Sequence, residues 1–126
     1  MFSSNVFVGD VTIAGVPDRG PGMWNYILNG TIYVNNLSYN KRVGFHIRVN
    51  GQWIDLLASY SRSLLTGGGK TLEVWEYRSN VLFAKSDLLQ PLKTFQFAVF
   101  YENLDWGTSY WDNNFGQDYF VTAVAS

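Results

Sequence analysis

Apolar residues alternate with polar ones in short runs along most of the chain. A period of two residues places successive side chains on opposite faces of a β-strand. The runs fall at residues 6–13, 26–34, 42–49, 72–77, 81–84, 95–101 and 119–124. No stretch longer than about ten residues keeps the apolar spacing and the caps of an amphipathic helix. The pattern therefore predicts seven or eight short strands and no helix.

Residues that favour turns separate these runs. Pro17 and Pro21 lie among glycines after the first run, and residues 35–41 are turn-like. Asn50-Gly51 predicts a two-residue hairpin, because both residues tolerate a positive φ. We find no internal repeat and no linker. Many short strands joined by turns are typical of an antiparallel β-sandwich, so we expect a single all-β domain over residues 1–126.

The low charge of the chain narrows the classes of partner. Charged residues make up 15% of its 126 residues, and the net charge is −1. Because it has no basic excess to contact phosphates, we expect neither nucleic acid nor an anionic membrane surface as a partner. No apolar run approaches the roughly 20 residues of a membrane span.

Metal and thiol chemistry are limited by composition too. The chain has no cysteine, which excludes disulfides, thiol catalysis and cysteine-ligated zinc. The one histidine, His46, excludes a multi-histidine metal site. We therefore expect no metal and no cofactor.

The sequence also lacks a persuasive catalytic or nucleotide-binding motif. A glycosidase needs two carboxylates facing each other across a cleft, and no local spacing singles out such a pair. His46 has no serine or cysteine motif as a companion, so we expect an exposed strand histidine. Gly67–Thr71 ends like a phosphate-binding loop, but Leu64 stands where that motif needs its first glycine, and residues 72–75 are strand-like. We expect a plain loop there, and a protein that is not an enzyme.

Aromatic residues are abundant, with 9 Phe, 8 Tyr and 5 Trp making up 17% of the chain. Rings and amides in a chain of low charge suit a neutral polar ligand, of which carbohydrate is the first candidate. The rings also suit the core of an all-β protein, so this alternative stays open.

The segment Tyr110–Tyr119 carries the most specific chemistry, because it joins rings to several amides and carboxylates. The C–H face of a glucose ring stacks on an aromatic plane, while its hydroxyls hydrogen-bond to amide and carboxylate groups. Asn and Asp also favour turns, so a structural role for this segment remains an alternative.

Five landmarks of carbohydrate-binding module family 21 are matched along the chain in the family's order. Tyr110–Tyr119 resembles the signature W-D-N-N-x-G-x-N-Y, and residues 30–43 resemble G-x-I-x-V-x-N-[IL]-x-[YF]-x-K-x-V. Trp53 and Ala58-Ser59-Tyr60 resemble the next two landmarks, and residues 97–102 resemble the strand E-F-A-x-x-Y-E. The resemblance is strongest over residues 24–122.

This family comprises starch- and glycogen-binding modules of some fungal glucoamylases and amylases, and of the glycogen-targeting subunits of protein phosphatase 1. The resemblance implies an immunoglobulin-like β-sandwich that binds α-1,4-glucans, without catalysis, at two sites. It places Trp53 and Trp111 as stacking rings at one site, and Tyr39 and Tyr60 at the other. It places polar contacts at Lys41, Glu73, Asn113 and Asp118.

Three positions depart from the family pattern. Ala98 stands where some starch-binding members have a stacking tyrosine, Gln96 replaces a glutamate, and Asp118 stands where Asn is more usual. The resemblance therefore leaves the shape of the first site open.

Two alternatives remain beside the glucan-binding module. In the first, the module is a glycogen-targeting scaffold that also recruits a phosphatase. Arg42-Val43-Gly44-Phe45 resembles the docking motif for protein phosphatase 1, but Val43 and Phe45 share the apolar side of a strand, so we expect them in the core. In the second, the sandwich is purely structural or protein-binding. An attached catalytic domain would indicate an extracellular amylolytic enzyme, whereas glycogen targeting would indicate a cytoplasmic protein.

Overall fold

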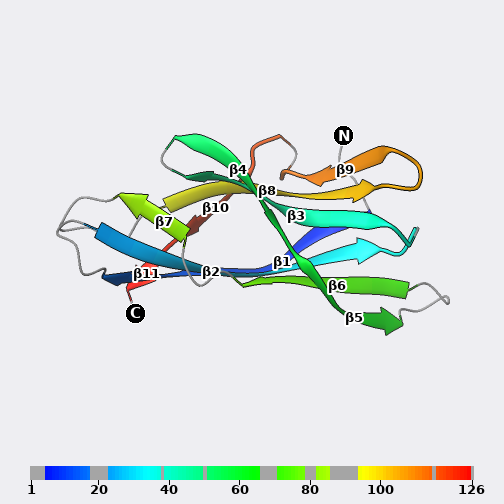
Figure 1. The fold of residues 1–126 in the computed structure, drawn as a ribbon, viewed down its shortest axis with the longest axis horizontal. Helices are drawn as coiled ribbons and strands as arrows, with labels where there is room; N and C mark the ends of the chain where they lie inside the picture. Colours follow the sequence, from blue (N-terminus) through cyan, green and yellow to red (C-terminus); the bar gives the residue numbers. More distant parts are fainter. Residues whose placement is uncertain are drawn as a thin grey trace.

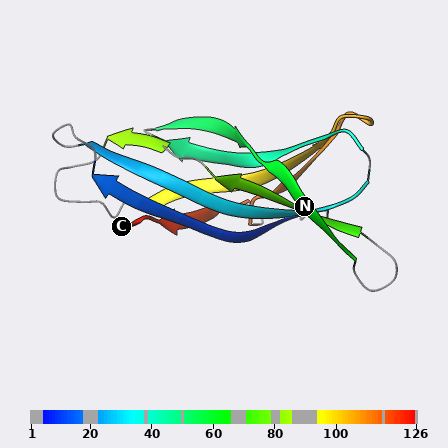
Figure 2. The same cartoon turned by 60° about the horizontal axis from the view of Figure 1, so that its bottom comes forward.

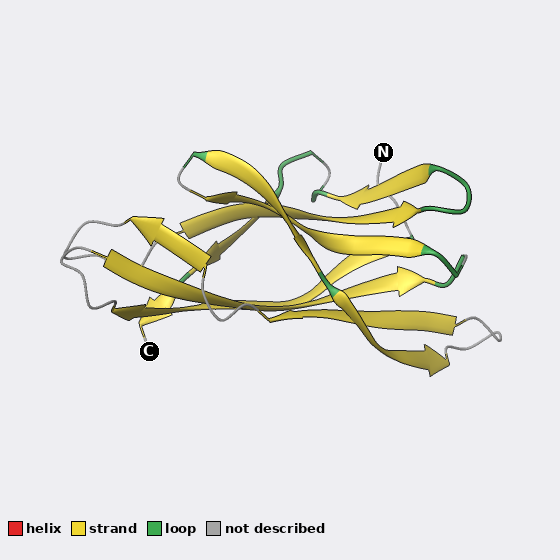
Figure 3. Cartoon of the chain, viewed as in Figure 1, coloured by secondary structure: helices red, strands yellow, loops and turns green. Residues whose placement is uncertain are grey.

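The computed structural model describes residues 5–17, 23–37, 39–49, 51–65, 71–78, 82–85, 94–114 and 116–125. Within these residues the chain forms eleven strands in two sheets and no helix (Figures 1 and 3). No helix there is long and apolar enough to cross a membrane. The prediction of an all-β sandwich is confirmed.

The larger sheet has the strand order β11-β1-β2-β6-β5, with β7 also paired to β2. Its strands are β1 (Val6–Pro17), β2 (Met23–Asn35), β5 (Ser59–Leu65), β6 (Thr71–Arg78), β7 (Leu82–Lys85) and β11 (Val124–Ala125). The smaller sheet has the order β10-β8-β3-β4, with β9 paired to β8. Its strands are β3 (Lys41–Val49), β4 (Gln52–Leu57), β8 (Thr94–Asn103), β9 (Thr108–Asp112) and β10 (Tyr119–Thr122). The described pairings are antiparallel except for that of β1 with β11.

The core lies between the inner faces of the two sheets. Its buried residues include Tyr26, Leu28, Ile32 and Val34 of β2, Val43, Phe45 and Ile47 of β3, and Phe95, Phe97, Val99 and Tyr101 of β8. Gly30 interrupts the apolar alternation of β2 because Phe45 of the facing sheet fills its place. A Cβ added to Gly30 would overlap Cζ of Phe45.

The structure has more strands than the seven or eight predicted, because the sequence pattern missed β4, β5 and β9 and took β10 and β11 as one run. All side chains of β5 are exposed, and those of β4 are exposed except Leu56. A strand shows a clear period of two only where one face is buried and the other is solvated. These segments therefore carry no alternation that predicts them.

Strands β4 and β5 form one nearly continuous stretch that leaves the smaller sheet and joins the larger one, as Figures 1 and 2 show. β4 pairs with β3 and β5 pairs with β6. At the crossing point, the Ala58 amide donates to the Val43 carbonyl at 2.8 Å. Trp53 and Tyr60 therefore lie on the same stretch of chain but in different sheets.

The structure confirms three local predictions from the sequence. Val49 pairs with Gln52, and Gly51 has a φ of +79°, as the predicted hairpin requires. Val43 and Phe45 are 1% and 0% exposed, so these two residues of the docking-like motif lie in the core as predicted. Strand β6 begins at Thr71, so the expected strand follows the glycine-rich segment. Residues 66–70 of that segment lie outside the described residues.

Candidate functional site

Trp53, Trp111 and His46 form an aromatic cluster on the outer face of the smaller sheet, called here the tryptophan face. His46 points outward because its neighbours Phe45 and Ile47 point into the core. β3 pairs with β4, which carries Trp53, and with β8, which in turn pairs with β9, which carries Trp111. Trp53 is 40% exposed and Trp111 is 41% exposed. Their rings are therefore accessible to a ligand.

His46 sets the angle between the two tryptophans. Its ring stacks on Trp53 with a centroid distance of 4.7 Å and an interplanar angle of 7°. The same imidazole meets Trp111 edge-on, at 5.5 Å and 83°. The two indole planes are therefore steeply inclined to each other. His46 Nδ1 is hydrogen-bonded to Asp55 Oδ1 at 2.6 Å, which holds the imidazole in this orientation.

His46 was predicted to be an exposed strand histidine, and this is only half right. It lies on the outer face, but its side chain is only 34% exposed because it packs against both tryptophans. Ala98, which pairs with His46 across β8, is 3% exposed. The third ring of this face is therefore that of His46. In the sequence, the only indication of this role is that His46 is the one histidine.

Asp112 organises the loop that follows Trp111. Its side chain accepts hydrogen bonds from the Val8 amide at 3.0 Å, the Tyr119 hydroxyl at 2.7 Å and the Asn114 amide at 3.4 Å. Asp112 is 3% exposed and so links the edge of the larger sheet to both ends of the loop. Asp112 therefore has the structural role that was one of the two alternatives for the segment Tyr110–Tyr119.

The loop itself is tightly closed. Asn114, Gly116 and Asp118 have positive φ values, which Gly, Asn and Asp adopt most readily. Asn113 Oδ1 accepts from the Gly116 amide at 3.0 Å, and Asp118 Oδ2 accepts from Gln96 Nε2 at 2.8 Å. Asn113 and Asp118 therefore each commit one polar atom to the protein, in the loop that begins two residues after Trp111.

Burial raises the pKa of Tyr119 to about 12, helped by its hydrogen bond to Asp112 and by the negative charge of that carboxylate. An unfolded tyrosine titrates near pH 10, so between about pH 10 and 12 the unfolded chain loses this proton more readily than the folded one. The contribution of Tyr119 to stability is present below pH 10 and is lost as the pH rises through 12. We expect urea unfolding to show a steeper loss of stability over this range for the wild type than for Tyr119→Phe. Equal slopes would contradict this role.

The other four predicted site residues come together in a cavity of about 490 Å³, called here the tyrosine pocket. Its lining residues are Asn36, Tyr39, Lys41, Tyr60, Glu73 and Trp75. Lys41 begins β3 in the smaller sheet, whereas Tyr60 and Glu73 belong to β5 and β6 in the larger one. The pocket therefore forms where the two sheets approach each other beside the β2–β3 connection.

A buried ion pair closes the floor of this pocket. Lys41 Nζ lies 2.9 Å from Glu73 Oε1 and donates to Asn36 Oδ1 at 3.0 Å. Trp75 Nε1 donates to the same Glu73 oxygen at 3.1 Å. The Lys41 and Glu73 side chains are 3% and 11% exposed, so each charge depends on the other.

The two tyrosines, in contrast, are open to solvent. Tyr39 is 93% exposed and Tyr60 is 52% exposed. Tyr60 meets Trp75 edge-on at 6.0 Å, and its hydroxyl lies 2.7 Å from Ser63 Oγ. Asn36 and Trp75 were not among the predicted site residues. Trp75 belongs to an alternating run that resembles an ordinary core strand.

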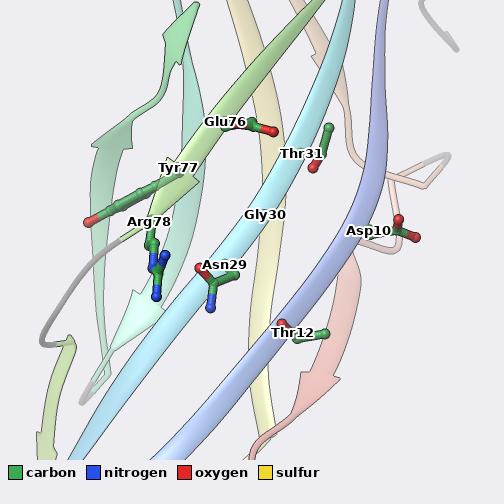
Figure 4. A pocket seen from close by; sticks show the side chains of 8 residues that line it. All are labelled: Asp10, Thr12, Asn29, Gly30, Thr31, Glu76, Tyr77 and Arg78. Carbon is green, nitrogen blue, oxygen red and sulfur yellow. The ribbon is translucent and has the colours of Figure 1, made fainter. Parts of the chain in front are cut away.

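A second depression, of about 290 Å³, lies on the larger sheet and is seen in Figure 4. Its lining residues are Asp10, Thr12, Asn29, Gly30, Thr31, Glu76, Tyr77 and Arg78. The one ring among them, Tyr77, is directed away from the others and packs near Phe45 at 6.2 Å. This depression therefore offers polar groups without an aromatic platform. Neither here nor in the rest of the described residues could a group of three His, Asp or Glu side chains hold a metal ion.

A β-sandwich that presents exposed tryptophans and tyrosines beside amides and carboxylates is typical of carbohydrate-binding modules. The particular family follows from family models: the model of carbohydrate/starch-binding module family 21 matches residues 21–122, so the chain belongs to this family. Membership of this family makes the chain a binding module rather than a catalytic domain. The resemblance found in the sequence is confirmed.

The fold is similar to a solved structure, the carbohydrate-binding module of the muscle glycogen-targeting subunit of protein phosphatase-1. The TM-score is 0.57 at 19% sequence identity, and the match covers 92% of this chain and 73% of that chain. At this identity the likeness concerns the fold. A search of curated protein sequences gave no match to the chain.

Proposed function

We propose that this module binds α-1,4-glucans such as starch, amylose, glycogen and maltooligosaccharides through aromatic stacking at two sites. The first site is the tryptophan face and the second is the tyrosine pocket. Trp53, Trp111, Tyr39 and Tyr60 supply the stacking surfaces. Asn113 and Asp118 supply polar groups beside the first site, while Lys41 and Glu73 do so in the second.

The observation that carries this proposal is the inclination of Trp53 to Trp111, fixed by the ring of His46. An α-1,4-linked chain turns from one glucose to the next, so its successive sugar faces point in different directions. Two inclined rings can contact two such faces together. A flat, extended β-1,4-linked chain would need platforms that lie nearly in one plane.

The ligand class is tested by retardation in gels that contain amylose, with titration calorimetry of maltoheptaose as the quantitative measure. We expect retardation by amylose, a stoichiometry of more than one maltoheptaose per chain, and no binding of cellohexaose at the same concentration. A chelator should leave binding unchanged, because no proposed contact involves a metal. Equal binding of the two oligosaccharides, or none by either, would contradict the proposal.

Glycogen targeting is the second candidate function, since the module of similar fold belongs to a subunit that directs protein phosphatase-1 to glycogen. Burial of Val43 and Phe45 prevents the docking-like motif from meeting a partner while the domain is folded. Recruitment would therefore need another segment of the protein. Co-precipitation of the phosphatase catalytic subunit by the glycogen-bound full-length protein would favour this candidate. A catalytic domain in the same open reading frame would instead favour an amylolytic enzyme.

A further inference from the structure

The turn between β8 and β9 carries a large exposed ring that neither of the proposed sites uses. Trp106 lies in this turn and is 61% exposed, and Leu104, two residues earlier, is 56% exposed. A single exposed apolar residue needs no explanation by itself. Trp106 differs from the other exposed residues in two ways. Hydrogen bonds hold its turn in one conformation, and further hydrogen bonds attach the turn to the segment beside the tyrosine pocket.

The turn is held in one conformation by hydrogen bonds of its own. Asn103 Oδ1 accepts from the amides of Asp105 and Trp106, at 3.1 and 3.2 Å. The Gly107 amide donates to the Asn103 carbonyl at 2.8 Å, and Gly107 has a φ of +69° that a side chain would disfavour. The backbone that carries the indole is thus fixed at both of its ends.

The same turn is docked against the rim of the tyrosine pocket. The Asp105 carboxylate accepts from the Asn40 amide at 3.1 Å and from Asn40 Nδ2 at 2.9 Å. The Leu104 amide donates to the Asn40 carbonyl at 3.0 Å. Asn40 stands between Tyr39 and Lys41, which both line the pocket. Three hydrogen bonds therefore tie the Trp106 turn to the segment that presents Tyr39.

We propose that Trp106 is an outer stacking platform for an α-glucan strand that leaves the tyrosine pocket past Tyr39. This inference rests on the proposed function, because it extends the second site. Because the backbone that carries the indole is already fixed, binding requires less ordering of the turn, which lowers its entropic cost. A glucan too short to reach beyond Tyr39 gains nothing from Trp106, whereas a longer one stacks on both rings. Trp106 thus makes the pocket selective for chain length.

The inference is tested in the variant Trp53→Ala/Trp111→Ala, in which only the tyrosine pocket binds. Calorimetry compares maltotriose with maltoheptaose before and after the further change Trp106→Ala. We expect maltoheptaose affinity to fall roughly 5- to 150-fold, the range for a lost stacking contact of about 1–3 kcal/mol, and maltotriose affinity to stay unchanged. Trp106→Phe should restore part of the loss.

Leu104→Ala is the matched control, because Leu104 is similarly exposed on the same turn and carries no ring. A loss for Leu104→Ala equal to that for Trp106→Ala would assign the effect to the turn as a whole and overturn the stacking role. Unchanged maltoheptaose affinity in Trp106→Ala would also overturn it, while leaving the proposed function intact if Tyr39→Ala still abolishes binding. Failure of the wild type to bind any glucan would instead reject the proposed function.

A second readout keeps the inference testable should the double variant not fold. The indole N–H resonance of Trp106 is assigned in wild-type protein by its disappearance in Trp106→Ala. It should shift on titration with maltoheptaose and remain in place with maltotriose. No shift with either sugar would overturn the inference.

Discussion

Replacing Trp53 or Trp111 by alanine is expected to weaken amylose binding by about 1–3 kcal/mol for each ring, the range measured for base stacking on aromatic side chains. That is roughly a 5- to 150-fold loss of affinity. Each indole is about 40% exposed, so its free face is available to a sugar. Calorimetry with maltoheptaose gives the affinity, and thermal unfolding checks the fold of each variant.

The matched control for these variants is Asn29→Ala. Asn29 lies in the polar depression of the larger sheet, which has no aromatic platform, so its loss should leave glucan affinity unchanged (Figure 4). If Trp53→Ala unfolds the domain, Trp53 is a core residue and its assignment to the site is wrong. If Asn29→Ala weakens binding as much as the tryptophan variants do, the sugar lies on the other sheet.

Tyr39→Ala should cause the larger loss on polymeric ligands. Two sites that engage one long glucan convert the second contact into an intramolecular event, and avidity can then exceed either affinity by roughly 10²–10⁴. The β4–β5 stretch carries a ring of each site, Trp53 and Tyr60, so the protein itself fixes their separation. We expect binding to glycogen or granular starch to fall by a factor approaching this range.

Short ligands separate this effect from a general loss of function. Tyr39 is 93% exposed, so its removal should cost the fold little. Maltotriose should therefore still bind at the tryptophan face, while the stoichiometry of a short ligand falls to one per chain. A stoichiometry of one in the wild type, unchanged in Tyr39→Ala, would show that only one site operates.

Much of the scaffold could be predicted from the sequence, because a strand with one buried face alternates apolar and polar residues. The runs at 42–49 and 95–101 coincide with the central strands β3 and β8, and Asn50-Gly51 joins β3 to β4 as predicted. Strands β4 and β5 were not predicted, because edge strands exposed on both faces show no such alternation. Their crossing from one sheet to the other depends on pairing partners distant in the sequence.

The sequence predicted which residues belong to the candidate site, but not which of them are exposed and which are buried. Tyr39 and Tyr60 are exposed, whereas Lys41 and Glu73 are buried against each other at 2.9 Å. A charge in the interior needs its partner, so these two residues shape the pocket as well as line it. Nothing in the local sequence around either residue specifies the other.

The strand periodicity, the family and the kinds of ring available to a sugar are all encoded in neighbouring residues, so the order of amino acids was enough to predict them. The orientation of the rings depends on the fold. His46 inclines Trp53 to Trp111, and Asp112 reaches Val8 across the sheets. The contacts of His46 with Trp111 and of Asp112 with Val8 join residues that are far apart along the chain, and they form only when hydrophobic burial folds the strands together.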